Sequence, residues 1–347
     1  MKALVYHGPG EYDWEDKTRP ALSAPTDAIV QISQTTICGT DLHILKGDVP
    51  TVTDGRTLGH EGVGVIVEKG EAVASFAVGD SVLISCITSC GRCEYCRRQM
   101  YSHCANGGWI LGNRIDGTQA EYVRIPFADT SLFRAPAGVD QESLAMLSDI
   151  LPTGFECGVL NGQVKPGDTV AIVGAGPIGL ATLITARLYS PAEMIVVDMD
   201  DGRLATARKL GATQTINSLG SCTTAVDAVL RLTRGVGVDV AIEAVGIPDT
   251  FDICQQIVAP GGRVANIGVH GKSAVLRLDR LWDRNITITT RLVDTAATPM
   301  LLRAVTSGAL DPKQLITHRF LLPEMLKAYD TFQNAAREGA LKVVMAR

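Results

Sequence analysis

Four cysteines lie within one short stretch of the sequence, and their spacing indicates a metal site. They are Cys90, Cys93, Cys96 and Cys104. Thiolates at two-residue spacing can turn inward onto one cation, and four sulfur ligands are typical of tetrahedral zinc. A shell closed by four thiolates leaves no position for a substrate, so this zinc is expected to be structural. The alternative is a disulfide pair or buried thiols, but the amino terminus has no secretory signal to indicate an oxidising compartment.

A second zinc site is expected upstream. Cys38 and His60 offer a thiolate and an imidazole that could hold one ion. Two ligands are too few to fix zinc, so a third is needed. Asp149 is the candidate, because it lies at the expected junction between two domains.

A glycine-rich segment follows an apolar run at 169–173 and precedes a helix-like one. Its members are Gly174, Gly176, Pro177, Ile178 and Gly179. In this strand-and-helix context the pattern predicts a dinucleotide loop. The first glycine permits the turn, the second lets the backbone approach a pyrophosphate, and the third lets the helix pack on the strand. The phosphates would then rest at the helix N-terminus.

Asp198 ends the next strand-like run, about twenty residues beyond the loop, where a carboxylate can accept both ribose hydroxyls of an adenosine. A 2′-phosphate would be repelled by Asp198, Asp200 and Asp201, so NAD is predicted rather than NADP. Arg203 could cover the adenosine or could be a solvated helix residue. The other interpretation of Asp198 is a turn or helix cap.

The elements that position these residues form two domains in a chain of 347 residues. Short Val- and Ile-rich runs before residue 150 indicate a mostly antiparallel β domain. From residue 169 apolar runs alternate with amphipathic ones, which is typical of a doubly wound parallel sheet. The expected boundaries are 1–150, 151–295 for the dinucleotide domain, and 296–347 for a segment that returns to the first domain.

Composition excludes several classes of protein. The formal net charge is −5 and no basic stripe is present, which argues against nucleic acid as a partner. The longest apolar stretch, 169–186, is interrupted by glycine and proline, so a strand, turn and helix explain it better than a membrane span. A cytoplasmic protein is expected.

Taken together, the motifs resemble the zinc-dependent medium-chain alcohol dehydrogenase family over essentially the whole chain. The matching segments are CGTD-x-H at 38–43, GHE at 59–61, the four-cysteine lobe, and GDTV-x-I-x-G-x-G-P-x-G at 167–179. The resemblance implies an α/β plus β fold, with a GroES-like catalytic domain joined to a Rossmann coenzyme domain and the substrate between them. It also implies a homotetramer, with a dimer as the alternative.

The resemblance assigns the catalytic zinc to Cys38, His60 and Asp149, with Glu61 as an intermittent ligand or a neighbouring partner. Asp41 would accept a hydrogen bond from the free ring nitrogen of His60, and it could also cap a helix. Thr153 would contact the nicotinamide.

In the mechanism that the resemblance implies, an alcohol loses its proton beside zinc and its hydride to NAD. Thr40 would take the proton and pass it through the ribose to His43 and solvent. A turn hydroxyl and a surface imidazole are the simpler interpretations of these two residues.

An aspartate at the third ligand position also occurs in secondary-alcohol dehydrogenases, whose pocket Trp109 resembles as well, although Trp109 could belong to the core. Cys86, Ile87 and Leu292 are further candidates for the substrate pocket. The leading hypothesis is an NAD-dependent enzyme acting on small primary or secondary alcohols and the corresponding aldehydes or ketones. A polyol or amino-alcohol dehydrogenase of the sorbitol or threonine type is the alternative. A non-enzymatic NAD-binding relative is disfavoured, since the candidate ligands and the relay hydroxyl are all present.

Overall fold

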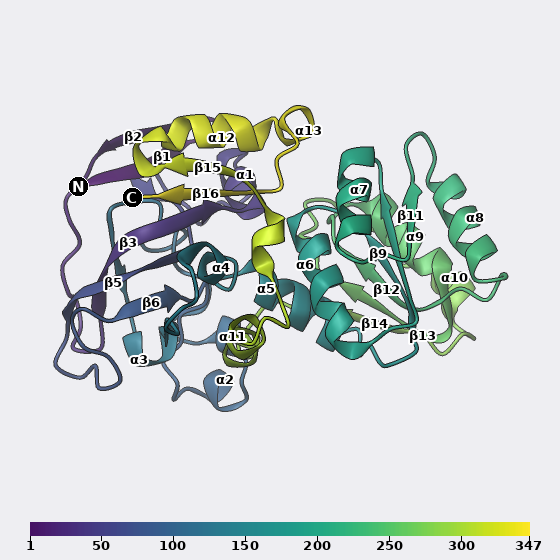
Figure 1. Ribbon diagram of the computed structural model, residues 1–347, viewed down its shortest axis with the longest axis horizontal. Helices are drawn as coiled ribbons and strands as arrows, with labels where there is room; N and C mark the ends of the chain where they lie inside the picture. The colour runs from purple at the N-terminus through teal and green to yellow at the C-terminus, as the bar shows by residue number, and fades with distance from the viewer. The chain divides into compact units, whose positions relative to one another are not determined.

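The chain divides into two units in a computed structural model that describes residues 1–347 (Figure 1). The first unit comprises residues 1–149 and 294–347, and the second comprises residues 150–293. None of the helices is both long enough and apolar enough to cross a lipid bilayer.

The second unit is built on a six-stranded sheet in the order β11-β10-β9-β12-β13-β14. All neighbouring strands are parallel. The strands are β9 (Thr169–Val173), β10 (Glu193–Asp198), β11 (Gln214–Asn217), β12 (Val238–Glu243), β13 (Val258–Asn266) and β14 (Thr287–Thr290). The order reverses between β9 and β12, as in a doubly wound dinucleotide-binding fold. The predicted Rossmann class is therefore confirmed.

Helices cover both faces of this sheet. They are α6 (Pro177–Ala186), α7 (Asp201–Lys209), α8 (Cys222–Leu232), α9 (Pro248–Ile257) and the short α10 (Leu278–Leu281), with the 3-10 turn η3 (Arg187–Tyr189) after α6. Because crossovers between parallel strands are right-handed, α6 and α7 cover one face and α8 and α9 the other (Figure 1). The unit begins with α5 (Ile150–Thr153) and the π-helix η2 (Gly154–Leu160).

The first unit contains a seven-stranded sheet in the order β15-β16-β3-β5-β6-β8, with β7 paired to β3, and a small sheet in the order β2-β1-β4. The strands are β1 (Lys2–Gly8), β2 (Glu11–Asp16), β3 (Ala28–Ile37), β4 (Arg56–Thr57), β5 (Gly62–Lys69), β6 (Ser81–Ile84), β7 (Tyr122–Ile125), β8 (Leu132–Arg134), β15 (Ile316–Leu321) and β16 (Lys342–Ala346). Pairing is antiparallel except between β15 and β16. The predicted antiparallel β architecture is confirmed.

The helices of the first unit are short. They are α1 (Gly39–Leu45), α2 (Glu94–Arg97), η1 (Tyr101–His103), α3 (Ala128–Ser131), α4 (Gln141–Ala145), α11 (Thr298–Thr306), η4 (Pro312–Leu315), η5 (Leu322–Glu324), α12 (Met325–Gln333) and α13 (Ala335–Glu338). The C-terminal strand β16 pairs antiparallel with β3, where Val343 faces Ile37. Tyr329 of α12 is fully buried in the core of this unit. Residues from both ends of the sequence therefore share one core.

Candidate metal centres and dinucleotide site

Three side chains from separate elements of the first unit meet in one buried group. Cys38 is the N-cap of α1, His60 precedes β5, and Asp149 follows α4. Their ligand atoms all lie within 4.8 Å of one another. Asp149 Oδ2 lies 3.2 Å from His60 Nε2 and 3.6 Å from Cys38 Sγ. The structure thus brings together the three residues that the sequence predicts as one ligand set.

This donor set fits zinc, because it combines a thiol, an imidazole nitrogen and a carboxylate oxygen that converge away from water. Burial raises the pKa of the Cys38 thiol. Burial alone would lower the pKa of His60, but hydrogen bonds to Asp149 and Cys38 raise it well above its usual value. The group therefore favours a positive charge at its centre, and a divalent cation supplies one.

Asp41 lies behind His60. The distance from Asp41 Oδ1 to His60 Nδ1 is 3.7 Å, longer than a hydrogen bond. Asp41 Oδ2 accepts hydrogen bonds from the Cys38 backbone at 2.9 Å and from Gln119 Nε2 at 3.0 Å. Oδ1 is buried without a hydrogen-bond partner. Asp41 therefore caps α1, whereas the predicted hydrogen bond from the free ring nitrogen of His60 is not formed at this distance.

Glu61 does not belong to the group of three converging donors. Its Oε2 accepts hydrogen bonds from Lys342 Nζ and Thr36 Oγ1. Lys342 Nζ also donates to the Ile37 carbonyl at 3.1 Å. Sequence reasoning missed Lys342, whose signal was a single charge within the otherwise apolar closing strand.

The two relay candidates lie one turn apart on α1. Thr40 Oγ1 is 3.7 Å from Cys38 Sγ. The half-exposed His43 ring places Nδ1 at 2.9 Å from Asp48 Oδ2. Since a carboxylate only accepts, Nδ1 carries the hydrogen of the neutral ring and Nε2 remains an acceptor. Thr40 is thus close to a candidate ligand, and His43 is open to water.

Two of the pocket candidates adjoin the ligand group. Cys86 Sγ lies 3.7 Å from Asp149 Oδ1, and its thiol is buried. The Trp109 ring meets the His60 ring edge-on with centroids 6.3 Å apart. Trp109 also packs against the core of the first unit, so core and pocket-wall roles are compatible. Ile87 is buried, whereas Leu292 belongs to the second unit and is 45% exposed.

The four cysteines of the lobe converge as well. The Sγ atoms of Cys90, Cys93, Cys96 and Cys104 lie within 4.8 Å of one another, and no disulfide joins them. Burial raises the pKa of Cys90, but hydrogen bonds from the Arg92 backbone and the Asn106 side chain outweigh it and lower that pKa to about 6. Backbone N–H groups that point at sulfur stabilise thiolates, and four thiolates fit a closed zinc site.

The glycine-rich loop has the geometry of a phosphate cradle. Gly174 has φ +109°, and a Cβ there would lie 2.5 Å from Val245 Cγ2. A Cβ on Gly179 would lie 1.9 Å from the Gly174 carbonyl oxygen, so the helix start can approach the strand only with glycine there. At Gly176 a Cβ would meet nothing within 4 Å, which leaves room for a ligand beside the backbone. Pro177 opens α6, with Ile178 next.

Asp198 ties this loop to the end of β10. Its Oδ2 accepts a hydrogen bond from Ala175 N at 2.6 Å, and its Oδ1 accepts one from Asp200 N at 2.9 Å. Each oxygen retains a lone pair for a further donor. Asp200 caps α7 through the Arg203 backbone, and the Arg203 side chain is half-buried. Thr153, at the end of α5, is also half-buried.

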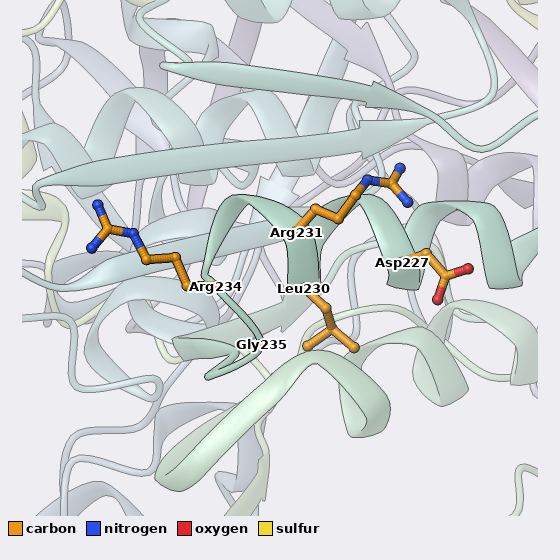
Figure 2. A pocket seen from close by; sticks show the side chains of 5 residues that line it. All are labelled: Asp227, Leu230, Arg231, Arg234 and Gly235. Atoms are coloured by element: carbon orange, nitrogen blue, oxygen red, sulfur yellow. The ribbon is translucent and has the colours of Figure 1, made fainter.

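A surface hollow in the second unit involves none of these residues. It is lined by Asp227, Leu230, Arg231, Arg234 and Gly235 around the end of α8 (Figure 2). The Arg231 and Arg234 side chains point away from each other (Figure 2). Their charges do not converge, so the hollow has no built anion site.

Two protein-family models match this chain. Residues 24–137 match the alcohol dehydrogenase GroES-like domain, and residues 177–307 match the zinc-binding dehydrogenase model. An alcohol dehydrogenase of Cupriavidus necator is 37% identical over 99% of this chain and 98% of its own length.

Solved structures agree over the full length. The apo form of zinc dependent alcohol dehydrogenase 2 from Streptococcus pneumonia superposes with a TM-score of 0.96 at 53% identity, covering 100% of this chain and 98% of that one. The alcohol dehydrogenase TADH from Thermus sp. ATN1 gives a TM-score of 0.92 at 33% identity, covering 100% and 99%. The chain therefore belongs to the zinc-dependent medium-chain alcohol dehydrogenase family, whose members are oxidoreductases that act on alcohols.

Proposed function

We propose that this protein transfers a hydride between NAD(H) and a small primary or secondary alcohol, or the corresponding aldehyde or ketone. The observation that carries the proposal is the buried convergence of Cys38, His60 and Asp149 within 4.8 Å. Three protein ligands leave a fourth position for a substrate oxygen, in contrast to the closed four-cysteine lobe.

Each residue around this group has a defined task. Cys38, His60 and Asp149 hold zinc, which when bound supplies a Lewis acid that lowers the pKa of an alcohol hydroxyl. Asp41 Oδ1 lies 3.7 Å from His60 Nδ1, and its negative charge favours a ring orientation that turns Nδ1 toward it. The Asp149 carboxylate completes the ligand set with a negative charge.

Proton removal is assigned to α1. Thr40 Oγ1, which lies close to Cys38, would accept the hydroxyl proton of the substrate while releasing its own hydroxyl proton, and His43 Nε2, an acceptor in the neutral ring, would take up the released proton. His43 Nε2 delivers a proton to water, since its Nδ1 is held by Asp48 and its ring is half-exposed. Glu61, held by Lys342, contributes negative charge near the ligands.

The cofactor proposal rests on the second unit. The backbone around Gly176 and the start of α6 would hold the pyrophosphate, and Asp198 would accept the adenosine ribose hydroxyls. NAD is favoured over NADP because Asp200 and Asp201 add negative charge where a 2′-phosphate would lie. Arg203 would cover the adenosine and Thr153 would contact the nicotinamide, the ring that accepts the hydride.

The substrate class follows from the pocket candidates. Cys86 and Trp109 flank the ligand group, and we expect the indole ring beside His60 to limit the size of the substrate. Uncharged walls favour simple alcohols over polyols or amino alcohols, which need polar partners for their additional groups.

The assembly proposed is a homotetramer, with a dimer as the alternative, in the cytoplasm. Four large exposed apolar side chains in the segment before β14 support self-association. They are Val275, Leu276, Leu278 and Trp282, each at least 46% exposed. Large apolar side chains that are exposed in one subunit are common at protein interfaces.

A steady-state screen tests the proposal. Purified enzyme with measured zinc content is assayed on propan-2-ol, ethanol, sorbitol and threonine, with NAD and with NADP. Turnover of the simple alcohols with NAD at two zinc ions per chain supports it. Activity confined to sorbitol or threonine would favour the polyol or amino-alcohol alternative, and two bound zinc ions without turnover on any of these would contradict it.

A further inference from the structure

Glu243, at the carboxyl end of β12, is a fully buried carboxylate that the reaction scheme does not use. Its Oε1 accepts three hydrogen bonds, from Val245 N at 2.9 Å, Gly246 N at 2.8 Å and Thr250 Oγ1 at 2.7 Å. A buried ionisable group with this many donors on one oxygen fixes the backbone that supplies them. Glu243 therefore sets the conformation of the loop at 244–246.

This loop interlocks with the loop that follows β13. A Cβ on Gly246, which has φ +88°, would lie 2.4 Å from the Val269 carbonyl oxygen. A Cβ on Gly268 would lie 2.1 Å from Gly246 N and 2.4 Å from Glu243 Oε2. The two backbones pack directly on each other with the carboxylate between them. Glu243 Oε2 also lies 3.5 Å from His270 Nε2, and it has no hydrogen-bond partner.

The same loop adjoins the phosphate cradle. Val245 Cγ2 occupies the space beside Gly174, and Ala244 N donates to the Val173 carbonyl at 2.9 Å. The Val245 side chain is nevertheless 44% exposed. An exposed apolar side chain at the edge of a phosphate loop is available to a ligand that lies on that loop.

The strand order indicates which part of the ligand this is. The cradle follows β9, and Asp198 ends β10 on one side of it, whereas β12 and β13 lie on the other side. If Asp198 holds the adenosine ribose, the far half of the dinucleotide must extend over the loops after β12 and β13. We propose that Glu243 is a positioning residue for the nicotinamide half of the cofactor, acting through Val245. This inference rests on the proposed dinucleotide function.

The test compares two ligands on the full-length, zinc-loaded enzyme. The Kd of NADH is measured by nicotinamide fluorescence, and the Kd of 5′-AMP, which contains only the adenosine half, by calorimetry. In Glu243→Ala we expect the Kd of NADH to rise about tenfold or more, with the Kd of 5′-AMP changed less than about twofold. Glu243→Gln, which keeps a carbonyl oxygen for the loop amides, should remain close to wild type for both ligands.

Matched variants separate this role from general destabilisation. Gln255 is buried and holds a different loop through Val275 O and Arg277 N. Gln255→Ala should therefore lower the thermal midpoint without raising the Kd of NADH more than the Kd of 5′-AMP. If Glu243→Ala does not fold, Glu243→Asp, which withdraws the carboxylate by one methylene, should show the same selective loss. Equal weakening of NADH and 5′-AMP, or no change for NADH, would overturn the inference. Asp198→Ala should weaken both ligands, and failure of the wild-type protein to bind either would refute the proposed function instead.

Discussion

Lys342 and Glu61 form an ion pair inside the first unit, where each side chain is only 1% exposed. Lys342 comes from the last strand of the chain and Glu61 from the segment beside His60. Burial opposes both charges, so the pair persists because each partner compensates the other. The C-terminal strand thereby determines the charge next to the candidate zinc ligands.

Removing one partner should be costly. Lys342→Met leaves the Glu61 carboxylate buried without a cation, so we expect a loss of about 3–5 kcal/mol in the free energy of unfolding, measured by urea titration. The double variant Glu61→Gln with Lys342→Met removes both charges and should recover most of that loss. A single variant as stable as wild type would show that the pair is unimportant.

Asp149→Ala should empty the candidate catalytic site. Two remaining ligands are too few to hold zinc, so metal analysis should fall from two ions per chain to one, and turnover should be lost. The four-cysteine lobe lies apart from this group, and its zinc should remain. Full activity in this variant would mean that the third ligand is assigned wrongly.

Cys93→Ser should lower the thermal stability of the protein before it lowers the rate of catalysis. A bound metal contributes to the free energy of folding. The free energy of unfolding should therefore fall by more than the roughly 1 kcal/mol typical of single substitutions. Thermal unfolding with parallel zinc analysis measures it. Cys222→Ser is the matched control, because Cys222 is exposed and outside the lobe, and its substitution should change stability by less than about 0.5 kcal/mol. Equal midpoints for both variants would argue against a filled lobe.

The cofactor preference should respond to charge at the end of β10. Replacing Asp198 with Gly together with Met199 with Arg removes a carboxylate and adds a cation where a 2′-phosphate would lie. The ratio of kcat/KM for NADP to that for NAD should rise by about tenfold or more, equivalent to ~1.4 kcal/mol. An unchanged ratio would contradict the ribose assignment of Asp198.

A surface carboxylate gives a pH dependence with a defined sign. Partial burial raises the pKa of Asp129, but hydrogen bonds from Ala74 N and Ser75 N outweigh it and hold that pKa below its usual value. Its stabilising contribution is present above the unfolded pKa of about 3.9 and disappears as the pH falls through the lower folded value. The gap in unfolding free energy between wild type and Asp129→Asn should therefore narrow as the pH is lowered from about 7 to about 3. A gap independent of pH would refute this.

Sequence patterns sufficed for most of the fold, because apolar runs bounded by glycine, proline and aspartate mark strands of either sheet. The sequence pattern does not indicate the strand β15, since only Ile316 of ITHRFL is buried and the charged or polar residues His318 and Arg319 interrupt the apolar run. The metal-ligand and nucleotide-binding residues could be predicted from the sequence, because zinc coordination and phosphate binding require particular residue types at particular spacings.

The supporting residues were harder to find. Lys342 and Glu243 act through contacts that join segments distant in the sequence, or through backbone amides, and neither leaves a recurring spacing. Gln119, which donates a hydrogen bond to Asp41, likewise acts through a contact between segments distant in the sequence. Only the three-dimensional pairing of strands and loops identifies such partners.

Because β16 pairs with β3 and supplies Lys342, the first unit lacks a strand until the ribosome has added residues 342–346. The intervening nucleotide-binding unit, by contrast, emerges whole and can fold during translation. Nascent chains stalled before residue 342 should consequently contain a formed nucleotide-binding unit and an immature first unit, and a deletion of codons 342–346 should disrupt the candidate metal site encoded hundreds of residues earlier.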